Sequence, residues 1–139
     1  MDIPTPADVD AFVVEHYPAM DSSGFRCESI SVGRAAARWH HDPGTLRPGG
    51  LISGPVQFTA ADLALWYLSF TIVGLQPMAV TSDLAITFLR PAVGGDLVAE
   101  ASLLRAGRTR ISGRVELRVE GDDRLVSHAT GSYAVLGDR

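Results

Sequence analysis

The fold is decided by residues 53–73, which read SGPVQFTAADLALWYLSFTIV. Pro55 suits the first position of a helix, and Ser53 or Gly54 can cap the amides at its start. From Val56 to about Val73, apolar side chains occupy nearly every side of the expected helix. Such a helix must be enclosed by other elements, so we expect the rest of the chain to wrap around it.

The chain before this helix predicts a shorter helix and a β-hairpin. Residues 5–17 begin with Thr5, a capping residue, followed by proline at the first helical position. Between residues 24 and 40 the side chains alternate in character around a turn at Gly33, which is typical of two paired strands. Residues 42–55 are rich in glycine and proline and predict a loop.

The chain after this helix predicts four strands joined by short turns that contain glycine, proline or aspartate. We expect these strands to form an antiparallel meander, and their approximate bounds are 78–89, 96–104, 109–119 and 125–136. Together with the hairpin they predict a curved antiparallel sheet around one apolar helix, an α+β fold. We expect residues 1–139 to form a single domain.

Composition excludes several functional classes. The net charge of -4 disfavours binding to nucleic acid. All 12 basic residues are arginine, which excludes mechanisms that need lysine. The single cysteine, Cys27, is expected to be an inert buried thiol. Residues 1–10 lack the pattern of an export signal and residues 51–80 are too interrupted to span a membrane, so we expect a cytoplasmic protein.

Asp62 is the only charged side chain between Pro48 and Ser82. A carboxylate in the middle of an enclosed helix is costly, so it needs a reason. One interpretation is structural, with Asp62 bonded to Thr59 or Thr81. The other, which we favour, is a general base or carboxylate nucleophile.

The start of the helix offers a second reactive feature. The backbone amide of Gly54 lies at the positive end of the helix dipole and could polarise a carbonyl oxygen. At about 1.5 Å rise per residue, Gly54 and Asp62 lie roughly 12 Å apart along the helix. A reacting carbonyl must lie about 3 Å from both groups. The two can therefore act together only if one subunit supplies Asp62 and another supplies Gly54, at a two-fold interface.

Four segments carry a family resemblance. They are RPGGLISGP at residues 47–55, followed by Ala61-Asp62, then TSDLAITFLRPA at 81–92 and GDL at 95–97. This pattern resembles the PaaI-type acyl-CoA thioesterases of the hotdog-fold superfamily, over residues 24–136. The resemblance implies five or six antiparallel strands around one long helix. It also implies a homodimer with a continuous sheet, usually paired into a tetramer, that hydrolyses an acyl-CoA to a free acid and coenzyme A without a metal or other cofactor.

The resemblance also assigns residues. The oxyanion donor is Gly54, the base or nucleophile is Asp62, and Thr81, with Ser82 beside it, helps to place the attacking water. The family has a histidine where this chain has Ser53 and an asparagine where it has Arg47. The glycine turn before the helix, which includes Gly50, belongs to the substrate-binding region.

Arginines are the candidates for binding the phosphates of coenzyme A, because their forked donors match phosphate oxygens. We expect Arg90 and one or more of Arg105, Arg108 and Arg110 near the mouth of the pocket.

Two other functions remain open. A hotdog dehydratase would need a catalytic histidine, but none lies between His41 and His128. A non-catalytic acyl-CoA binding or sensing protein is favoured by the replacements at Ser53 and Arg47, while Asp62 argues against it. The spacing of the histidines predicts no metal site, and no GxSxG motif indicates a serine hydrolase.

Overall fold

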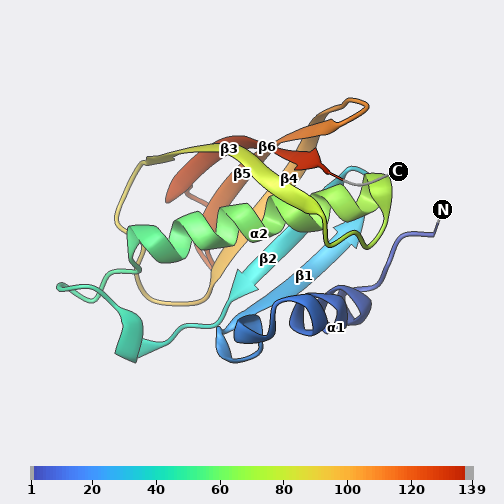
Figure 1. The fold of residues 1–139 in the computed structure, drawn as a ribbon. Coiled ribbons are helices and arrows are strands. Elements are labelled where there is room, and N and C mark those ends of the chain that lie inside the picture. Colours follow the sequence, from blue (N-terminus) through green and yellow to red (C-terminus); the bar gives the residue numbers. More distant parts are fainter. Residues whose placement is uncertain (1, 137–139) are drawn as a thin grey trace.

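The computed structural model describes residues 2–136, which form two α-helices and one six-stranded sheet (Figure 1). The elements, in chain order, are α1 (Pro6–His16), the 3-10 helix η1 (Pro18–Ser22), β1 (Phe25–Ser31), β2 (Arg34–Trp39), the 3-10 helix η2 (Pro43–Thr45), α2 (Gly54–Val73), β3 (Ala79–Phe88), β4 (Leu97–Ala106), β5 (Arg110–Val119) and β6 (Ser127–Val135). The expected α+β class and the two helices are confirmed.

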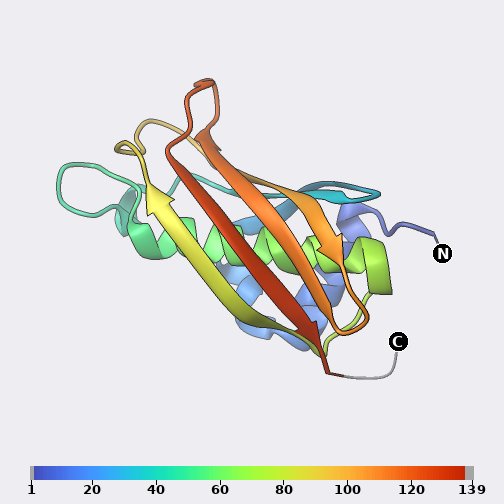
Figure 2. The same cartoon turned by 90° about the horizontal axis from the view of Figure 1, so that it is seen from above.

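The sheet is antiparallel throughout, with the strand order β1-β2-β4-β5-β6-β3. Seen from above in Figure 2, β3 to β6 cross over α2. The expected meander is right for β4, β5 and β6 but wrong for β3, which pairs with β6 at the sheet edge. Residues 89–96 form a long connection to β4, and β4 pairs on its other side with β2. β3 therefore has one unpaired edge in this chain.

Two glycines let α2 approach the sheet closely. Gly113 and Gly131 are direct partners in the β5–β6 register. A Cβ atom on Gly113 would lie 2.7 Å from Leu68 of α2, and one on Gly131 would lie 3.0 Å from Leu65 of α2 and 2.6 Å from the carbonyl oxygen of Asp83 in β3. These two positions therefore need glycine for lack of space.

The α2 helix is less enclosed in one chain than its composition predicts. In the most hydrophobic part of the helix, 67% of the residues are buried. By length and composition alone the helix could cross a membrane, as the core helix of a folded protein also can. Most of the inner side is buried, but Phe58 keeps 42% of its surface exposed and Asp62 and Trp66 are only half-buried. The expectation of complete enclosure is therefore wrong for a single chain, and the open side of α2 needs a further explanation.

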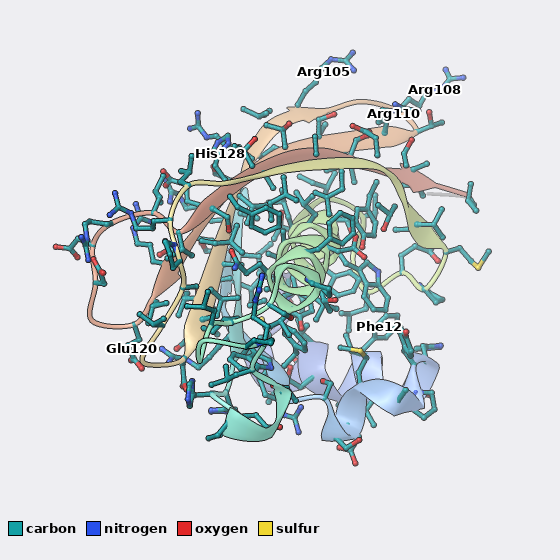
Figure 3. The ribbon with its side chains drawn as sticks, turned by 90° about the vertical axis from the view of Figure 1, so that its left-hand side faces the viewer. Phe12, Arg105, Arg108, Arg110, Glu120 and His128 are labelled. Atoms are coloured by element: carbon teal, nitrogen blue, oxygen red, sulfur yellow. The ribbon has the colours of Figure 1, made fainter. Side chains whose placement is uncertain are left out.

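The helix α1 packs beside α2 and against β1. Thr5 and Asp8 form a reciprocal capping box at its start. Phe12 points towards α2 (Figure 3), where its ring lies 5.4 Å from that of Phe70. Burial raises the pKa of the Cys27 thiol to about 12, which agrees with an unreactive cysteine.

Asp96, from the segment GDL, has a structural role at the end of the sheet. Its carboxylate accepts hydrogen bonds from the His41 amide at 2.8 Å and from Arg38 at 3.1 Å. These contacts, the amide first, lower the pKa of Asp96. Asp96 thus fixes the chain leaving β2 against the start of β4.

We predict that Gly131→Ala will lower the free energy of unfolding by about 1–3 kcal/mol, the usual cost of overpacking. The cause is the clash of the new Cβ with the Asp83 carbonyl oxygen, which the backbone cannot avoid without shifting the strand. Urea titration measures the loss. Thr130→Val, an exposed neighbour on the same strand, serves as control and should stay within about 0.5 kcal/mol. Equal stability of the two variants would show that the sheet can yield at this position.

Candidate functional site

Asp62 lies in the middle of α2, and its carboxylate is held by two hydroxyl groups. Thr81 Oγ1 donates to Asp62 Oδ1 at 2.6 Å, and the Tyr133 hydroxyl donates to the same oxygen at 2.7 Å. The Tyr133 hydroxyl also lies 3.0 Å from the backbone oxygen of Asp62. Among the described residues no hydrogen bond reaches Oδ2. One carboxylate oxygen thus accepts two hydrogen bonds, and the other accepts none from the described residues.

The sheet register explains why both hydroxyls meet this carboxylate. Thr81 and Tyr133 are direct partners in the β3–β6 pairing, so their side chains lie on the same face. A bulge between Thr81 and Asp83 then shifts the register. Leu84 and Ile86 pair with Gly131 and Ala129, while Ser82 falls within the bulge and is exposed. The bulge thus lets Thr81 join the site while the rest of β3 packs against α2.

Tyr133 is a donor over the whole physiological pH range. Its side chain is 5% exposed, and burial, followed by the nearby charge of Asp62, raises its pKa far above the ordinary value of 10.0. The hydroxyl therefore stays protonated and keeps its hydrogen bond to Asp62. The structural interpretation of Asp62, a bond to Thr81, is thus correct as a contact and compatible with a free reactive oxygen.

A pocket of about 450 Å³ opens beside Asp62. Its lining comes from the end of α1, the middle of α2 and the start of β3, mostly with apolar side chains. The lining residues are His16, Tyr17, Asp62, Leu63, Trp66, Pro77, Met78, Ala79, Val80, Thr81 and Tyr133. We call this the aspartate pocket. It offers space for an apolar group next to the free carboxylate oxygen.

The first turn of α2 leaves one amide available. Ser53 is the N-cap, and its hydroxyl accepts from the Val56 amide at 3.2 Å. Pro55 has no N–H, and the Gln57 amide donates to the Ser53 carbonyl oxygen at 3.1 Å. The Gly54 amide makes no hydrogen bond within residues 2–136. It is the donor of this turn that a ligand can use.

A second pocket, of about 460 Å³, lies at this end of α2. We call it the helix-start pocket. It is lined by Arg47, Leu51, Ile52, Gly54, Gln57, Phe88, Leu89, Arg90, Pro91 and Ala92. Both Arg47 and Arg90 are exposed, and Arg90 donates to the Leu125 carbonyl oxygen at 3.1 Å. Gly50, also predicted for substrate binding, is exposed in the loop at a φ of +74°.

The structure places the predicted residues in separate groups. Asp62 and Thr81 share the aspartate pocket, while Gly54, Arg47 and Arg90 share the helix-start pocket. Within one chain these pockets are distinct.

The other arginines predicted to bind phosphate, Arg105, Arg108 and Arg110, lie at the far end of the sheet from Arg90. Figure 3 shows Arg105, Arg108 and Arg110 around the β4–β5 turn, pointing away from α2. Arg110 lines a depression beside Asp83 instead of either pocket. One chain therefore does not bring Arg90 together with Arg108 or Arg110.

Two residues of these pockets were missed by sequence reasoning, Tyr133 and Gln57. Tyr133 falls on the same side of β6 as the buried Ala129, Gly131 and Val135, so alternation gives its direction but not its partner.

No group of three or more histidine, cysteine, aspartate or glutamate side chains in the described part of the chain could hold a metal ion.

The chain is similar to known proteins in sequence and in fold. A protein of Saccharolobus solfataricus, provisionally named an esterase, is 29% identical over 108 residues, which are 78% of this chain and 76% of that protein.

Two solved structures are similar over most of the chain. One from Silicibacter sp. TM1040, provisionally named a thioesterase, is 28% identical, covers 97% of this chain and 96% of its own, and has a TM-score of 0.86. A mutant of the phenylacetic acid degradation protein PaaI from Thermus thermophilus is 27% identical, covers 86% and 99% of the two chains, and has a TM-score of 0.73.

The family model of the thioesterase superfamily matches residues 49–126, which include α2, β3, β4 and β5. The chain therefore belongs to the thioesterase superfamily and has the hotdog fold of its PaaI-type members.

Proposed function

We propose that the protein hydrolyses acyl-CoA thioesters to a free acid and coenzyme A, with Asp62 as base or nucleophile. The observation that carries this proposal is the asymmetric bonding of Asp62. Two hydroxyls donate to Oδ1, and Oδ2 accepts no hydrogen bond from the described chain. A half-buried carboxylate held in this way presents one unbonded oxygen in a fixed direction, as a general base or a nucleophile requires.

The oxyanion donor in this proposal is the Gly54 amide of a second copy. Gly54 and Asp62 lie on one rigid helix, about 12 Å apart. One thioester carbonyl cannot contact both groups of the same chain. A two-fold axis solves this problem because it brings the start of one α2 helix to the middle of the other.

The free edge of β3 supports such an assembly. Antiparallel pairing of two β3 strands centred on Ala85 would pair Leu84 of one copy with Ile86 of the other, both of which face α2, and would place the bulge at Thr81 and Ser82 opposite Phe88 of the other copy. Thr81 bonds Asp62, and the ring of Phe88 packs against Gly54, 3.2 Å from where a Cβ would be. This pairing would therefore join the aspartate pocket of one copy to the helix-start pocket of the other.

An apolar surface next to this edge supports the same interface. Phe58 and Phe88 are 42% and 51% exposed. With Gly54, Pro55, Thr59 and Ile86 they line a shallow depression of about 510 Å³. Exposed aromatic side chains next to an unpaired strand are typical of surfaces that associate.

Catalysis then proceeds by one of two routes. As a base, Asp62 Oδ2 takes a proton from water while the water oxygen attacks the thioester carbonyl carbon. As a nucleophile, Oδ2 attacks that carbon and forms a mixed anhydride, which water then hydrolyses. In both routes the Gly54 amide stabilises the oxyanion, the C–S bond breaks, and the coenzyme A thiolate leaves and takes up a proton. Thr81 retains lone pairs that can orient the water.

Phosphate binding is assigned to arginines from two copies. Arg90 and Arg47 lie at the helix-start pocket. The antiparallel pairing of β3 would bring the β4–β5 turn of the other copy, with Arg108 and Arg110, to the same end. In this arrangement Arg90 of one copy and Arg108 and Arg110 of the other would lie at the same end of the assembly.

Asp62→Asn tests the chemistry. The amide keeps an Oδ1 acceptor for both hydroxyls but cannot act as base or nucleophile. We expect turnover to fall at least about a hundredfold, with the thermal midpoint unchanged or higher. Release of free thiol from acyl-CoA and differential scanning fluorimetry measure the two quantities.

Asp123→Asn, at an exposed aspartate, is the matched control and should leave both quantities unchanged. A less stable Asp62→Asn protein with near-normal turnover would make Asp62 a structural anchor. A wild-type protein that binds acyl-CoA without turnover would instead be the binding or sensing protein.

Tyr133→Phe tests the fixation of the carboxylate. Loss of a hydrogen bond to a charged group should lower kcat about tenfold or more, with KM little changed, because the reactive oxygen loses its fixed direction. Tyr67→Phe is the control, since this other buried tyrosine makes no hydrogen bond to Asp62. Equal kcat values for both variants would leave Tyr133 with a packing role alone.

Phe58→Glu tests the two-fold interface. A charge there should prevent association, and since Phe58 is partly exposed in one chain, the monomer should still fold. We expect monomers by light scattering and loss of turnover of at least about tenfold. The control Val32→Glu, at a 78% exposed position in the β1–β2 turn, should remain assembled and active. A monomer with full turnover would contradict the shared site.

A further inference from the structure

Two buried side-chain atoms lack a hydrogen-bond partner in the described chain, Gln57 Oε1 and Ser127 Oγ. Gln57 is 4% exposed, and its Nε2 donates to the Ile52 carbonyl oxygen at 3.2 Å. This bond fixes the amide and leaves Oε1 as an unused acceptor. Buried acceptors in proteins are nearly always satisfied, so this exception calls for a donor from outside the chain.

Gln57 differs in this respect from the other buried polar side chains of α2. The Ser69 hydroxyl donates to the Trp66 carbonyl oxygen and the Thr71 hydroxyl donates to that of Leu68. Both are satisfied within the helix and need no ligand. The side-chain amide oxygen of Gln57 has no such hydrogen-bond partner within the described chain.

The position of Gln57 relates this acceptor to the proposed reaction. Gln57 lines the helix-start pocket, one helical turn after Gly54, whose amide is also unused. The adjoining walls, Ile52, Phe88 and Ala92, are apolar, and Arg47 and Arg90 lie at the exposed side. The pocket thus combines a donor, an acceptor and two cations.

We propose that Gln57 is a specificity-determining residue whose Oε1 accepts a hydrogen bond from the substrate. It selects thioesters that carry an N–H or O–H donor about one helical turn, roughly 5 Å, from the carbonyl group. This inference rests on the proposed function, since it takes the Gly54 amide as the site of the carbonyl oxygen. Oε1 is buried in the structure, so the proposal requires the Gln57 side chain to turn towards the helix-start pocket when the substrate binds.

Two parts of an acyl-CoA carry such a donor. One is the first amide of the pantetheine arm, close to the sulfur atom. The other is a hydroxyl group on the acyl chain, such as that of a 3-hydroxyacyl group. Both present the same chemistry to Gln57, and synthetic substrates separate them.

The test compares Gln57→Leu with the wild type on two pairs of substrates. The first pair, butyryl-CoA and 3-hydroxybutyryl-CoA, differs in the acyl hydroxyl. The second pair, the butyryl thioesters of N-acetylcysteamine and of ethanethiol, differs in the amide. We expect the variant to lose up to about tenfold more kcat/KM for the donor-bearing member of one pair than for its partner. The pair that responds identifies the source of the donor.

Comparison within one protein sample makes the result independent of the fraction folded. Gln57→Met, which is also unbranched and similar in length, repeats the test if leucine disturbs the helix. Ser127→Ala is the matched control, because it removes the other unpartnered buried polar group. It should keep the substrate ratios of the wild type.

Binding measurements separate this inference from the proposed function. Calorimetry with the same four compounds is repeated on Asp62→Asn and on Asp62→Asn/Gln57→Leu. The dissociation constant for the donor-bearing compound should rise by up to about tenfold in the double variant, even if no thioester is hydrolysed. Equal changes for all four compounds, in both kinetics and binding, would overturn the role of Gln57 and leave it as a structural amide.

Discussion

The site depends on one shared acceptor, Asp62 Oδ1, to which Thr81 and Tyr133 both donate. These two bonds join the middle of α2 to β3 and β6, the two strands at the free side of the sheet. They compensate much of the desolvation of the carboxylate and also select its orientation. A carboxylate without these hydrogen bonds could rotate and point either oxygen in several directions, whereas this carboxylate presents a single unbonded oxygen. Fixation and reactivity thus come from the same contacts.

If Gly54 and Asp62 act on one carbonyl group, as we propose, the rigidity of α2 requires a second copy. An α-helix keeps Gly54 and Asp62 at a fixed separation that no side-chain movement can close. The same chain leaves β3 unpaired and the aromatic rings of Phe58 and Phe88 partly exposed next to it. A monomer would keep two incomplete pockets and an unprotected strand edge. Pairing through β3 removes both difficulties at once, which is why we link assembly to catalysis.

Much of the fold follows from local sequence signals. The cap at Ser53, the proline after it and the apolar run predict α2 within two residues of its observed start. The lone charge of Asp62 stands out in the same stretch. The edge position of β3 could not be predicted in this way, because turn residues show where strands end but not which strands pair across the sheet.

The missed site residues show a related limit. Alternation places Tyr133 on the inner face, yet its bond to Asp62 depends on the register of β3 against β6 and on the bulge at Ser82. Gln57 is one of several polar residues in the mostly apolar α2, and its significance appears only when burial and missing partners are known. A sequence shows which groups are unusual, but the unsatisfied atom is a property of the packed structure.

The residues that depart from the family pattern are compatible with a working oxyanion site. Ser53 stands where the family has histidine, and its hydroxyl accepts from the Val56 amide. Pro55 has no N–H, and the backbone N–H of Gln57 donates to the Ser53 carbonyl oxygen. The backbone N–H of Gly54 is therefore the donor of this turn that remains without a partner in the described chain. The Ser53 hydroxyl proton can still be donated to a neighbouring group. What histidine would have added, a ring that changes charge near neutral pH, is absent from this turn. In the proposed reaction, polarisation of the carbonyl therefore falls to a backbone amide and the helix dipole, neither of which titrates.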